Sequence, residues 1–413
     1  MAGPLDAGDA GSDVADVAIS GAGPAGATLA LLLGRAGLRV DLFDARHFPR
    51  EKPCGEGILP AGVAVLDRIG LRQAVGGRAL RTVRYHGFGV VAESPFGPGA
   101  VALAQRRLRL DQVLLDAVRQ TPGVRVFEDA EVEGVEQANG RAVGLRIGSG
   151  IRRARLVVGA DGLSSCVRRT LGLDVPPRGR RVGARMHFKL AGGRDLGDRL
   201  SIFVGRGYEL YAAPLPDGEL LLAGLADQES WAKGARRALR RWILDQPILR
   251  DALEGAEPLT GPAGRTGLVR TARAGWAPGA VLLGDAAAST DPLTAGGLAH
   301  ALVTAERLAA AVPAYLAEGD AVLARFDRDR RRLLRSHDWL TRGLVALVRR
   351  PLLARATLHL MRAAPPLMRR LVAVAAGTSI QRPASVAASS IPALAISSAT
   401  DQNAMLPQRA ESP

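Results

Sequence analysis

Short apolar runs alternate with helical patterns from the start of the chain. Asp16–Ser20 is a run typical of a buried strand, and a glycine-rich turn follows it directly at residues 21–26. Ala27–Leu33 has the apolar pattern of a helix, and Leu38–Phe43 predicts a second strand. A strand, a tight turn, a helix and a second strand in this order are typical of a parallel α/β sheet.

The middle of the chain predicts two more helices and a series of strands. The apolar positions of Leu108–Gln120 follow a helical period, and we expect a further helix from near Gly296 through Ala311. Short or alternating apolar runs predict strands at Val124–Phe127, Val132–Val135, Ala142–Ile147, Leu156–Ala160 and Ala280–Leu283, and a β-rich block over Val182–Ala226.

The C-terminal part of the chain is predicted to be helical, basic and amphipathic from Glu318 to about Gly377. Prolines break this pattern at Pro351 and at Pro365-Pro366, because proline cannot continue a helix. Residues 382–413 are rich in Ala, Ser and Pro and contain no aromatic residue, a composition that predicts a disordered tail.

Composition excludes several classes of protein. The chain has 413 residues, of which 47% are hydrophobic and 23% charged, so it can bury a large core without a disulfide or a structural metal. Cys54 and Cys166 are the only cysteines, and they form no CxxC pair and no Cys/His cluster. We therefore expect neither a disulfide framework nor a metal site.

The net charge of +15 first suggests a nucleic-acid partner, but its distribution does not. The basic residues are almost all arginines spread along the chain, the lysines being Lys52, Lys189 and Lys233, and aromatic residues amount to only 4%. We therefore expect no nucleic-acid binding. Met1–Val14 has no signal-peptide pattern and no apolar run is long enough to span a membrane, so we expect a cytoplasmic protein.

The glycine-rich turn carries the first chemical signal. Gly21, Gly23 and Gly26 form a GxGxxG pattern between a predicted strand and a predicted helix, and Asp44 follows Gly26 at the end of the second strand. Glycines here let backbone N–H groups approach a pyrophosphate at the positive end of the helix, and the acidic residue holds ribose hydroxyls. The pattern predicts a dinucleotide site without distinguishing NAD from FAD, and an incidental glycine turn is the alternative.

Two later motifs point to FAD. The segment 159–168, Gly-Ala-Asp-Gly-Leu-Ser-Ser-Cys-Val-Arg, resembles the GADGxxSxVR motif of the para-hydroxybenzoate hydroxylase-like superfamily of FAD-dependent oxidoreductases. Gly284-Asp285-Ala286-Ala287, followed by Asp-Pro-Leu-Thr-Ala-Gly-Gly at 291–297, resembles the second FAD fingerprint of that superfamily. The three motifs occur in the family order. The resemblance implies FAD as cofactor and NAD(P)H as a transient co-substrate.

The resemblance also implies roles for individual residues. Asp285 would bind the ribityl chain, with a helix N-cap as its structural alternative, and Gly296 and Gly297 would offer N–H groups to the flavin. Arg46 and Arg107 would contact FAD, unless each is a solvated surface arginine. The full set of cofactor-binding candidates is Gly21, Gly23, Gly26, Asp44, Arg46, Arg107, Asp161, Gly162, Gly284, Asp285, Pro292, Gly296 and Gly297.

The fold expected from these motifs is α/β, with a Rossmann-like FAD-binding domain of the GR2 type, an inserted β-sheet substrate domain and a C-terminal helical region. The predicted boundaries are 13–177 and 271–317 for the two parts of the FAD-binding domain, 178–270 for the β-rich substrate domain, 318–381 for the helical region and 382–413 for the tail.

The branch of the superfamily is less clearly marked. Lys52-Pro53-Cys54-Gly55-Glu56-Gly57 and the DPLT segment look like the geranylgeranyl reductase-like branch, but a glycine replaces the glutamate of its DPxTGEG motif. Its YxWxFP motif is also not matched, because Glu209, Tyr211 and Ala213 stand at the aromatic positions. Hydroxylases usually carry GDAAH, where this chain has Ala288, and halogenases need a WxWxIP motif that finds no match.

We therefore expect an NAD(P)H-dependent monooxygenase that hydroxylates a small aromatic or polyketide-like metabolite. The alternative is a reductase of carbon–carbon double bonds in an isoprenoid or other lipophilic substrate. The third hypothesis is a binding partner without enzymatic activity, in which FAD only stabilises the fold. Flavin chemistry itself needs no diagnostic side-chain triad, which is why sequence alone leaves this choice open.

On the substrate side, catalytic residues are unknown, and Cys54 and Glu56 are the candidates because their segment runs from the FAD domain toward the active site. A small packed cysteine is the alternative for Cys54, and structural roles are favoured for His187 and His300. The arginines and leucines around Leu344–Val374 suggest a peripheral membrane contact, against a helical cap whose arginines face water. Substrate, choice of NADH or NADPH, and oligomeric state stay open.

Overall fold

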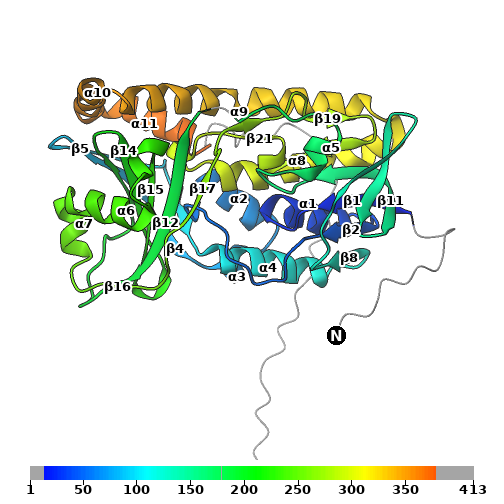
Figure 1. The fold of residues 1–413 in the computed structure, drawn as a ribbon, viewed down its shortest axis with the longest axis horizontal. Helices are drawn as coiled ribbons and strands as arrows, with labels where there is room; N and C mark the ends of the chain where they lie inside the picture. Colours follow the sequence, from blue (N-terminus) through cyan, green and yellow to red (C-terminus); the bar gives the residue numbers. More distant parts are fainter. Residues whose placement is uncertain (1–13, 178, 378–413) are drawn as a thin grey trace, which may run out of the picture. The chain divides into compact units, whose positions relative to one another are not determined.

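The computed structural model describes residues 14–177 and 179–377, which form two large sheets with helices packed on both (Figure 1). The predicted α/β class with a Rossmann-like FAD-binding fold and a C-terminal helical region is confirmed. The tail predicted at 382–413 lies outside the described residues, and the boundaries of the predicted domains stay a prediction.

The first sheet has a parallel centre in the order β20-β11-β1-β2-β8, with β19 antiparallel at its edge. Val17 of β1 lies opposite Leu156 on one side and Val40 on the other. Residues at the centre of this sheet, such as Val17, Ile19 and Val158, have no solvent contact, as is typical of parallel strands covered on both faces. The strands are β1 (Ala15–Ser20), β2 (Val40–Phe43), β8 (Val124–Phe127), β11 (Gly150–Gly159), β19 (Trp276–Ala277) and β20 (Ala280–Leu282).

One strand of this sheet is longer than the sequence predicts. β11 begins at Gly150 rather than Leu156, because its first half leaves the parallel sheet and pairs antiparallel with β10 (Arg141–Ile147), which pairs with β9 (Gly134–Ala138). Exposed arginines interrupt the apolar pattern there, so the prediction was six residues short.

Three helices cover one face of the first sheet. They are α1 (Pro24–Arg35), α4 (Arg107–Arg119) and α8 (Gly297–Glu318), all three predicted from their apolar periods. α1 packs between α4 and α8, and its residue Leu29 has no solvent contact. This packing fixes the start of α1, and with it the glycine-rich turn, at the end of β1.

The second sheet runs β16-β12-β15-β14-β13-β5-β6, with β17 also pairing with β12. α6 (Ala235–Leu244) and α7 (Pro247–Ala252) cover one face, where Trp242 and Leu239 are buried. The other face, with Leu200 and Tyr211, packs toward the FAD-binding part. The strands are β5 (Thr82–Gly87), β6 (Val90–Pro95), β12 (Arg181–Lys189), β13 (Arg199–Val204), β14 (Tyr208–Pro214), β15 (Glu219–Asp227), β16 (Glu257–Pro258) and β17 (Ala263–Thr266).

This sheet also takes strands from a segment in which we predicted none. β5 and β6 belong to the range assigned to the first FAD-binding segment, yet β5 lies parallel to β13. The remaining short elements are α2 (Pro60–Arg68), α3 (Arg72–Val75), α5 (Cys166–Thr170), β3 (Gly57–Ile58), β4 (Arg78–Leu80), β7 (Ala102–Ala104), β18 (Arg270–Thr271) and β21 (Ala288–Ser289).

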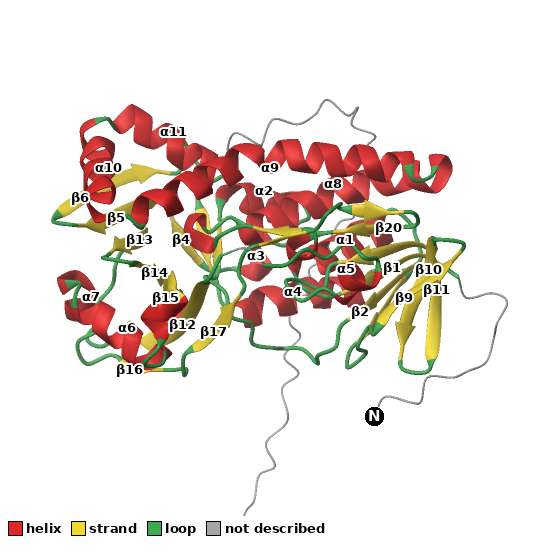
Figure 2. Cartoon of the chain, turned by 45° about the horizontal axis from the view of Figure 1, so that its top comes forward, coloured by secondary structure: helices red, strands yellow, loops and turns green. Residues whose placement is uncertain are grey.

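The C-terminal helices break where the prolines predict. α9 (Ala321–Val348) ends before Pro351, α10 (Pro351–Ala363) begins there, and α11 (Pro365–Ala375) follows. α10 and α11 pack on β6 and on the end of α9 (Figure 2). Within the described residues, no helix combines the length and hydropathy that crossing a bilayer requires.

Candidate FAD cleft and active site

The glycine-rich turn leaves open space above the start of α1. A Cβ at Gly26 would lie 1.9 Å from the carbonyl oxygen of Gly21, and a Cβ at Gly21 would lie 2.5 Å from that of Ala160. These two glycines are required by packing. At Gly23 the nearest atom to a Cβ is the Arg50 Nη2, 3.8 Å away, so the protein itself leaves this position free. A space of this kind at a helix N-terminus suits a pyrophosphate.

Asp44 lies beside this space. Its Oδ2 accepts a hydrogen bond from the Ala22 backbone N–H at 2.9 Å and its Oδ1 accepts one from the Arg46 N–H at 3.1 Å. The Arg46 side chain itself is exposed, whereas Arg50 points at Asp44, with 3.3 Å between Nη2 and Oδ2. Arg50, and not Arg46, is therefore the arginine whose side chain lies near the predicted pyrophosphate position.

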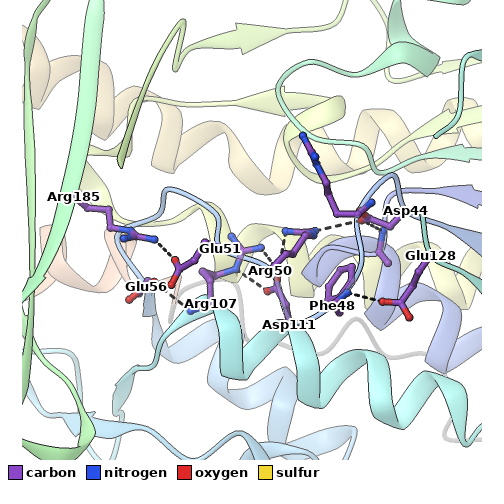
Figure 3. Close-up of polar contacts among 11 residues, drawn as sticks. Asp44, Phe48, Arg50, Glu51, Glu56, Arg107, Asp111, Glu128 and Arg185 are labelled. Carbon is purple, nitrogen blue, oxygen red and sulfur yellow. Dashed lines mark hydrogen bonds and ion pairs between the residues drawn. The ribbon is translucent and has the colours of Figure 1, made fainter. Parts of the chain in front are cut away.

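Arg50 also takes part in a chain of ion pairs with buried residues of α4. Its Nη1 lies 3.4 Å from Asp111 Oδ2, and Asp111 binds Arg107 through two hydrogen bonds of 2.7 Å (Figure 3). Burial alone would lower the pKa of the Arg107 guanidinium, but Asp111 and the Cys54 sulfur outweigh burial and raise it. Arg107 is thus a buried, permanently charged group rather than a solvated surface arginine.

The segment resembling GADGxxSxVR presents a carboxylate with one free oxygen. Asp161 Oδ2 accepts the N–H groups of Cys166 and Val167 at the start of α5, at 2.7 and 3.1 Å. Its buried Oδ1 has no hydrogen-bond partner among the described residues. Gly162 has φ +75, and the Lys52 Nζ lies 3.3 Å from the position of a Cβ there. The segment therefore offers an unpaired acceptor next to a lysine ammonium.

The second fingerprint faces the same space. Asp285 follows β20 in a 3-10 turn and lines a cavity, and no hydrogen bond or ion pair engages its carboxylate within residues 14–177 and 179–377. Burial and Arg107 lower the pKa of Lys52, while the Asp285 charge opposes them. Gly297 opens α8 with nothing within 4 Å of a Cβ, so its N–H end is accessible. Gly284 and Pro292 line the same cavity.

Glu56 and His187 form a buried hydrogen bond on the substrate side. Glu56 Oε2 lies 2.8 Å from His187 Nε2, and its Oε1 accepts the Arg107 backbone N–H at 3.3 Å. The other ring nitrogen of His187 lies 3.2 Å from Arg185 Nη1, and Arg185 in turn pairs with Glu51 (Figure 3). His187 is therefore fully engaged with protein groups, which agrees with a structural role.

Cys54 lies at the border between these groups and the cavity. Its Sγ accepts the Glu56 backbone N–H at 3.3 Å, and the thiol is partly buried. Cys54 lines the cavity, as do Glu56 and Asp285. A thiol that faces the same cavity as the predicted flavin loop can give or take a proton there.

The cavity encloses about 1380 Å³, including the space at its open mouth. It reaches from the second fingerprint to the second sheet and to α9, and most of its lining is apolar or glycine. Representative lining residues are Leu163, Leu200, Leu225, Leu268, Leu298 and Leu334. The polar lining residues include Asp285 and Asp291 of the fingerprint segment, Arg185 and Arg265 of the second sheet, and Arg330 of α9.

Two imidazoles meet behind the fingerprint loop. His300 of α8, which lines the cavity, and His337 of α9 are in edge contact, with 4.2 Å between ring centroids. Burial lowers the pKa of His337 to about 4, and burial, followed by His337, lowers that of His300 well below its usual value. Both rings are therefore neutral at physiological pH, and neither supplies an imidazolium proton.

A buried ion pair ties the second sheet to the fingerprint loop. Arg181 of β12 pairs with Glu209 of β14, and its Nε lies 3.0 Å from Asp291 Oδ2. Burial raises the pKa of both carboxyls, an effect that Arg181 opposes. Tyr211 also donates a hydrogen bond to the Leu293 carbonyl. Glu209, which breaks the YxWxFP pattern, thus holds the loop in place.

These features fit FAD: a cradle that a Cβ at Gly23 would fill, the unpaired oxygen of Asp161, and free N–H and carboxylate groups at the second fingerprint. Of the predicted cofactor-binding residues, Gly284, Asp285, Pro292 and Gly297 line the cavity. The Arg46 side chain is exposed, and Gly296 packs against His337, whose Nε2 would lie 2.5 Å from a Cβ there. The sequence did not identify Arg50, Lys52, Asp111 and His187 as part of the site. Lys52 had two signals, because it opens the Lys52–Gly57 segment that resembles the geranylgeranyl reductase-like branch and is one of three lysines in an arginine-rich chain. The ligand roles of all these residues stay predictions.

Comparison with known proteins agrees with the geometry. Residues 14–189 match the family described as FAD binding domain. The menaquinone reductase of Mycolicibacterium smegmatis is 31% identical over 72% of this chain and 75% of its own. Digeranylgeranylglycerophospholipid reductase 2 of Methanopyrus kandleri is 28% identical over 75% and 80%. A flavin-dependent monooxygenase of Mycobacteroides abscessus is 36% identical over 38% and 37%.

A solved structure gives the same picture. The myxobacterial chondrochloren halogenase, an FAD-dependent halogenase, superposes with a TM-score of 0.73 at 27% identity, covering 81% of this chain and 82% of that one. Together with the matched FAD-binding domain and the relative that aligns over most of both chains, this likeness fixes the family. The chain is an FAD-dependent enzyme that belongs to the para-hydroxybenzoate hydroxylase-like superfamily of oxidoreductases.

Proposed function

We propose that this enzyme reduces a carbon–carbon double bond in the polyprenyl chain of a lipid, with NAD(P)H as the source of electrons. The observation that carries the proposal is the cavity, whose lining is mostly apolar or glycine, with Arg185 and Arg265 of the second sheet and Arg330 of α9 among its polar residues. Small-molecule pockets combine such an apolar lining with a few polar groups that fix the orientation of the ligand. This lining suits a hydrocarbon chain beside the flavin ring.

The relatives favour the same reaction. The two relatives that align with three quarters of their own length are reductases named for menaquinone and for a digeranylgeranyl phospholipid. Both of these compounds carry polyprenyl chains. The flavin-dependent monooxygenase aligns over little more than a third of either chain, so its likeness extends less far. This weighs against hydroxylation, which the sequence alone favoured.

The reaction needs a proton donor as well as a hydride. Bound reduced flavin supplies the hydride to one carbon of the double bond. The other carbon must then receive a proton, and Cys54 is the cavity-lining group placed to give it. The thiol hydrogen leaves sulfur and bonds to carbon, and the resulting thiolate is held by the adjacent Arg107 guanidinium until it takes a proton from solvent. The apolar lining excludes water from this step.

Product analysis under anaerobic conditions tests the proposal. The holoenzyme, NADPH or NADH, and detergent-dispersed menaquinone or digeranylgeranyl phospholipid are incubated without oxygen, and the lipids are examined by mass spectrometry. We expect a product that has gained two hydrogen atoms, and no change in a lipid with a fully saturated chain. If products form only with oxygen present and gain one oxygen atom, the enzyme is the hydroxylase instead.

A further inference from the structure

The outward face of α10 is mostly apolar, with His359 as its exposed polar residue. Ala354, Leu358 and Met361 are buried against the neighbouring strand and helices, whereas Leu352 and Leu360 are 83% and 53% exposed. Leu352 and Leu360 are eight residues apart in sequence, so they share one side of the helix, away from the buried three. An isolated exposed leucine needs no explanation, but two on one face, with Ala356 between them, form an apolar stripe.

Arginines flank this stripe. Arg355 and Arg362, also exposed, are seven residues apart and therefore lie together along one edge of α10. On α11 the exposed residues include Leu367, Arg369 and Arg370. Because the exposed side of α10 is mostly apolar and is bordered by arginines, α10 has the arrangement of helices that lie in a membrane interface.

The charge of this region is one-sided. Residues 339–377 contain seven arginines and no aspartate, glutamate or lysine. Arg349 pairs with Asp227. No ion pair to a carboxylate of residues 14–177 or 179–377 is found for Arg350, Arg355, Arg362, Arg369 and Arg370. Five uncompensated cations around a leucine stripe would repel a second copy of the same surface, but they attract an anionic bilayer.

We propose that α10 and α11 form a membrane-docking surface for anionic lipid bilayers. Leu352 and Leu360 enter the acyl region, and Arg355, Arg362, Arg369 and Arg370 contact lipid phosphates. The arginines add electrostatic attraction to the anionic surface, and the leucines add burial of apolar side chains in lipid. This inference goes beyond the proposed function and does not depend on it, because binding to vesicles is measured without turnover.

Vesicle flotation of the full-length holoenzyme tests the surface. Wild type is expected to float with vesicles of phosphatidylcholine containing about one third phosphatidylglycerol, and far less with phosphatidylcholine alone or at high salt. The double variant Leu352→Asp/Leu360→Asp and the double variant Arg355→Gln/Arg362→Gln should each reduce the bound fraction about tenfold or more.

Matched control residues lie on α6, outside the proposed docking surface. Leu244 is 56% exposed there, and Arg236 and Arg240 are exposed on the same helix. Leu244→Asp and Arg236→Gln/Arg240→Gln should bind vesicles as wild type does. Circular dichroism and retained flavin verify that every variant is folded.

Three results would overturn the proposal. One is wild type that does not float with anionic vesicles. Another is equal binding by wild type and the α10 variants. The third is a lipid-free dimer, seen by analytical ultracentrifugation, that Leu352→Asp/Leu360→Asp converts to a monomer while vesicle binding is absent, because the face would then be an interface between copies of the chain.

Discussion

His187 and Glu56 are joined by a hydrogen bond of 2.8 Å between Nε2 and Oε2, and neither side chain contacts solvent. The bond connects the loop before β3 with β12, the strand that carries Arg185 as well. Glu56 holds this position with φ 54, a left-handed backbone conformation that non-glycine residues adopt only at some cost. The contact therefore fixes the Cys54–Glu56 segment against the second sheet.

Removing one partner of this contact should destabilise the fold. Glu56→Ala leaves the buried imidazole unpaired, and we expect a loss of about 3–5 kcal/mol in the free energy of unfolding, with a smaller loss for Glu56→Gln. Asp67→Ala on α2 is the control, because the side chains of Asp67 and its partner Arg72 are 48% and 41% exposed, and it should cost about 1 kcal/mol or less. Urea denaturation measures both. Equal losses for Glu56→Ala and Asp67→Ala would show that the buried bond is not a structural tie.

In the glycine-rich turn, Gly26 is required for packing, whereas Gly23 is expected to leave room for the cofactor. Gly26→Ala should prevent folding, since its Cβ would meet a carbonyl oxygen at 1.9 Å. Gly23→Ala should fold, yet bind FAD at least about tenfold more weakly, because its Cβ enters the pyrophosphate space. Flavin fluorescence gives the affinity. Gly343→Ala, at an open position of α9, serves as the neutral control. Unchanged FAD affinity in Gly23→Ala would move the pyrophosphate elsewhere.

Lys52 should contribute to holding the cofactor. Its Nζ lies 3.3 Å from the position of a Cβ at Gly162, and the Asp285 charge acts on its pKa, so Lys52→Gln removes an amino group beside the space where FAD is expected. We expect the FAD dissociation constant to rise about tenfold, a change of about 1.4 kcal/mol. The exposed Lys233→Gln makes the same change of side chain and should leave affinity unaltered. Identical constants for the two variants would contradict a role for Lys52.

Cys54 should act in transfer to substrate and not in reduction of the flavin. Cys54→Ala is expected to lower turnover of the lipid about a hundredfold, the usual contribution of a proton donor, while NAD(P)H reduces the flavin at the wild-type rate. Cys166→Ala removes the only other cysteine and should be silent. Stopped-flow spectra separate the two half-reactions. Full turnover in Cys54→Ala would leave Cys54 as a packed residue.

The two neutral histidines predict a pH dependence of stability. Burial lowers the pKa of His337 from 6.5 to about 4, so between these values the unfolded chain binds a proton that the folded protein does not. The free energy of unfolding must therefore fall as pH falls through this window. His337→Phe should lose about 2 kcal/mol less than wild type between about pH 7 and pH 5. Parallel pH profiles for the two proteins would refute this assignment.

Much of the fold followed from local patterns. The first strand–turn–helix unit, α4, α8 and the breaks at Pro351 and Pro365 all depend on residues near in sequence, so a short window reveals them. β5 and β6 do not, because β5 joins the second sheet by pairing with β13, more than a hundred residues later, and β6 joins it through β5. The first half of β11 was hidden by its exposed arginines.

The candidate site was likewise predictable only where it depends on local sequence. Motif spacing selected Gly23, Asp161 and Asp285 as cofactor-binding candidates, and their ligand roles stay predictions. Spacing cannot show that Arg50 rather than Arg46 turns inward, or that Glu56 meets His187 across 131 positions of sequence. Such contacts arise only when two sheets pack together. Glu209 is the clearest example, since it departs from a family motif in sequence yet pairs with Arg181 in the fold.

The most direct measurement mixes anaerobically reduced enzyme with a polyprenyl lipid and follows the flavin spectrum. A double-bond reductase must return electrons from flavin to substrate, so we predict that the flavin is reoxidised without oxygen, at a rate that depends on lipid concentration and falls sharply in Cys54→Ala. Flavin that stays reduced with every polyprenyl lipid, and is reoxidised only when oxygen enters, would contradict the proposed reaction.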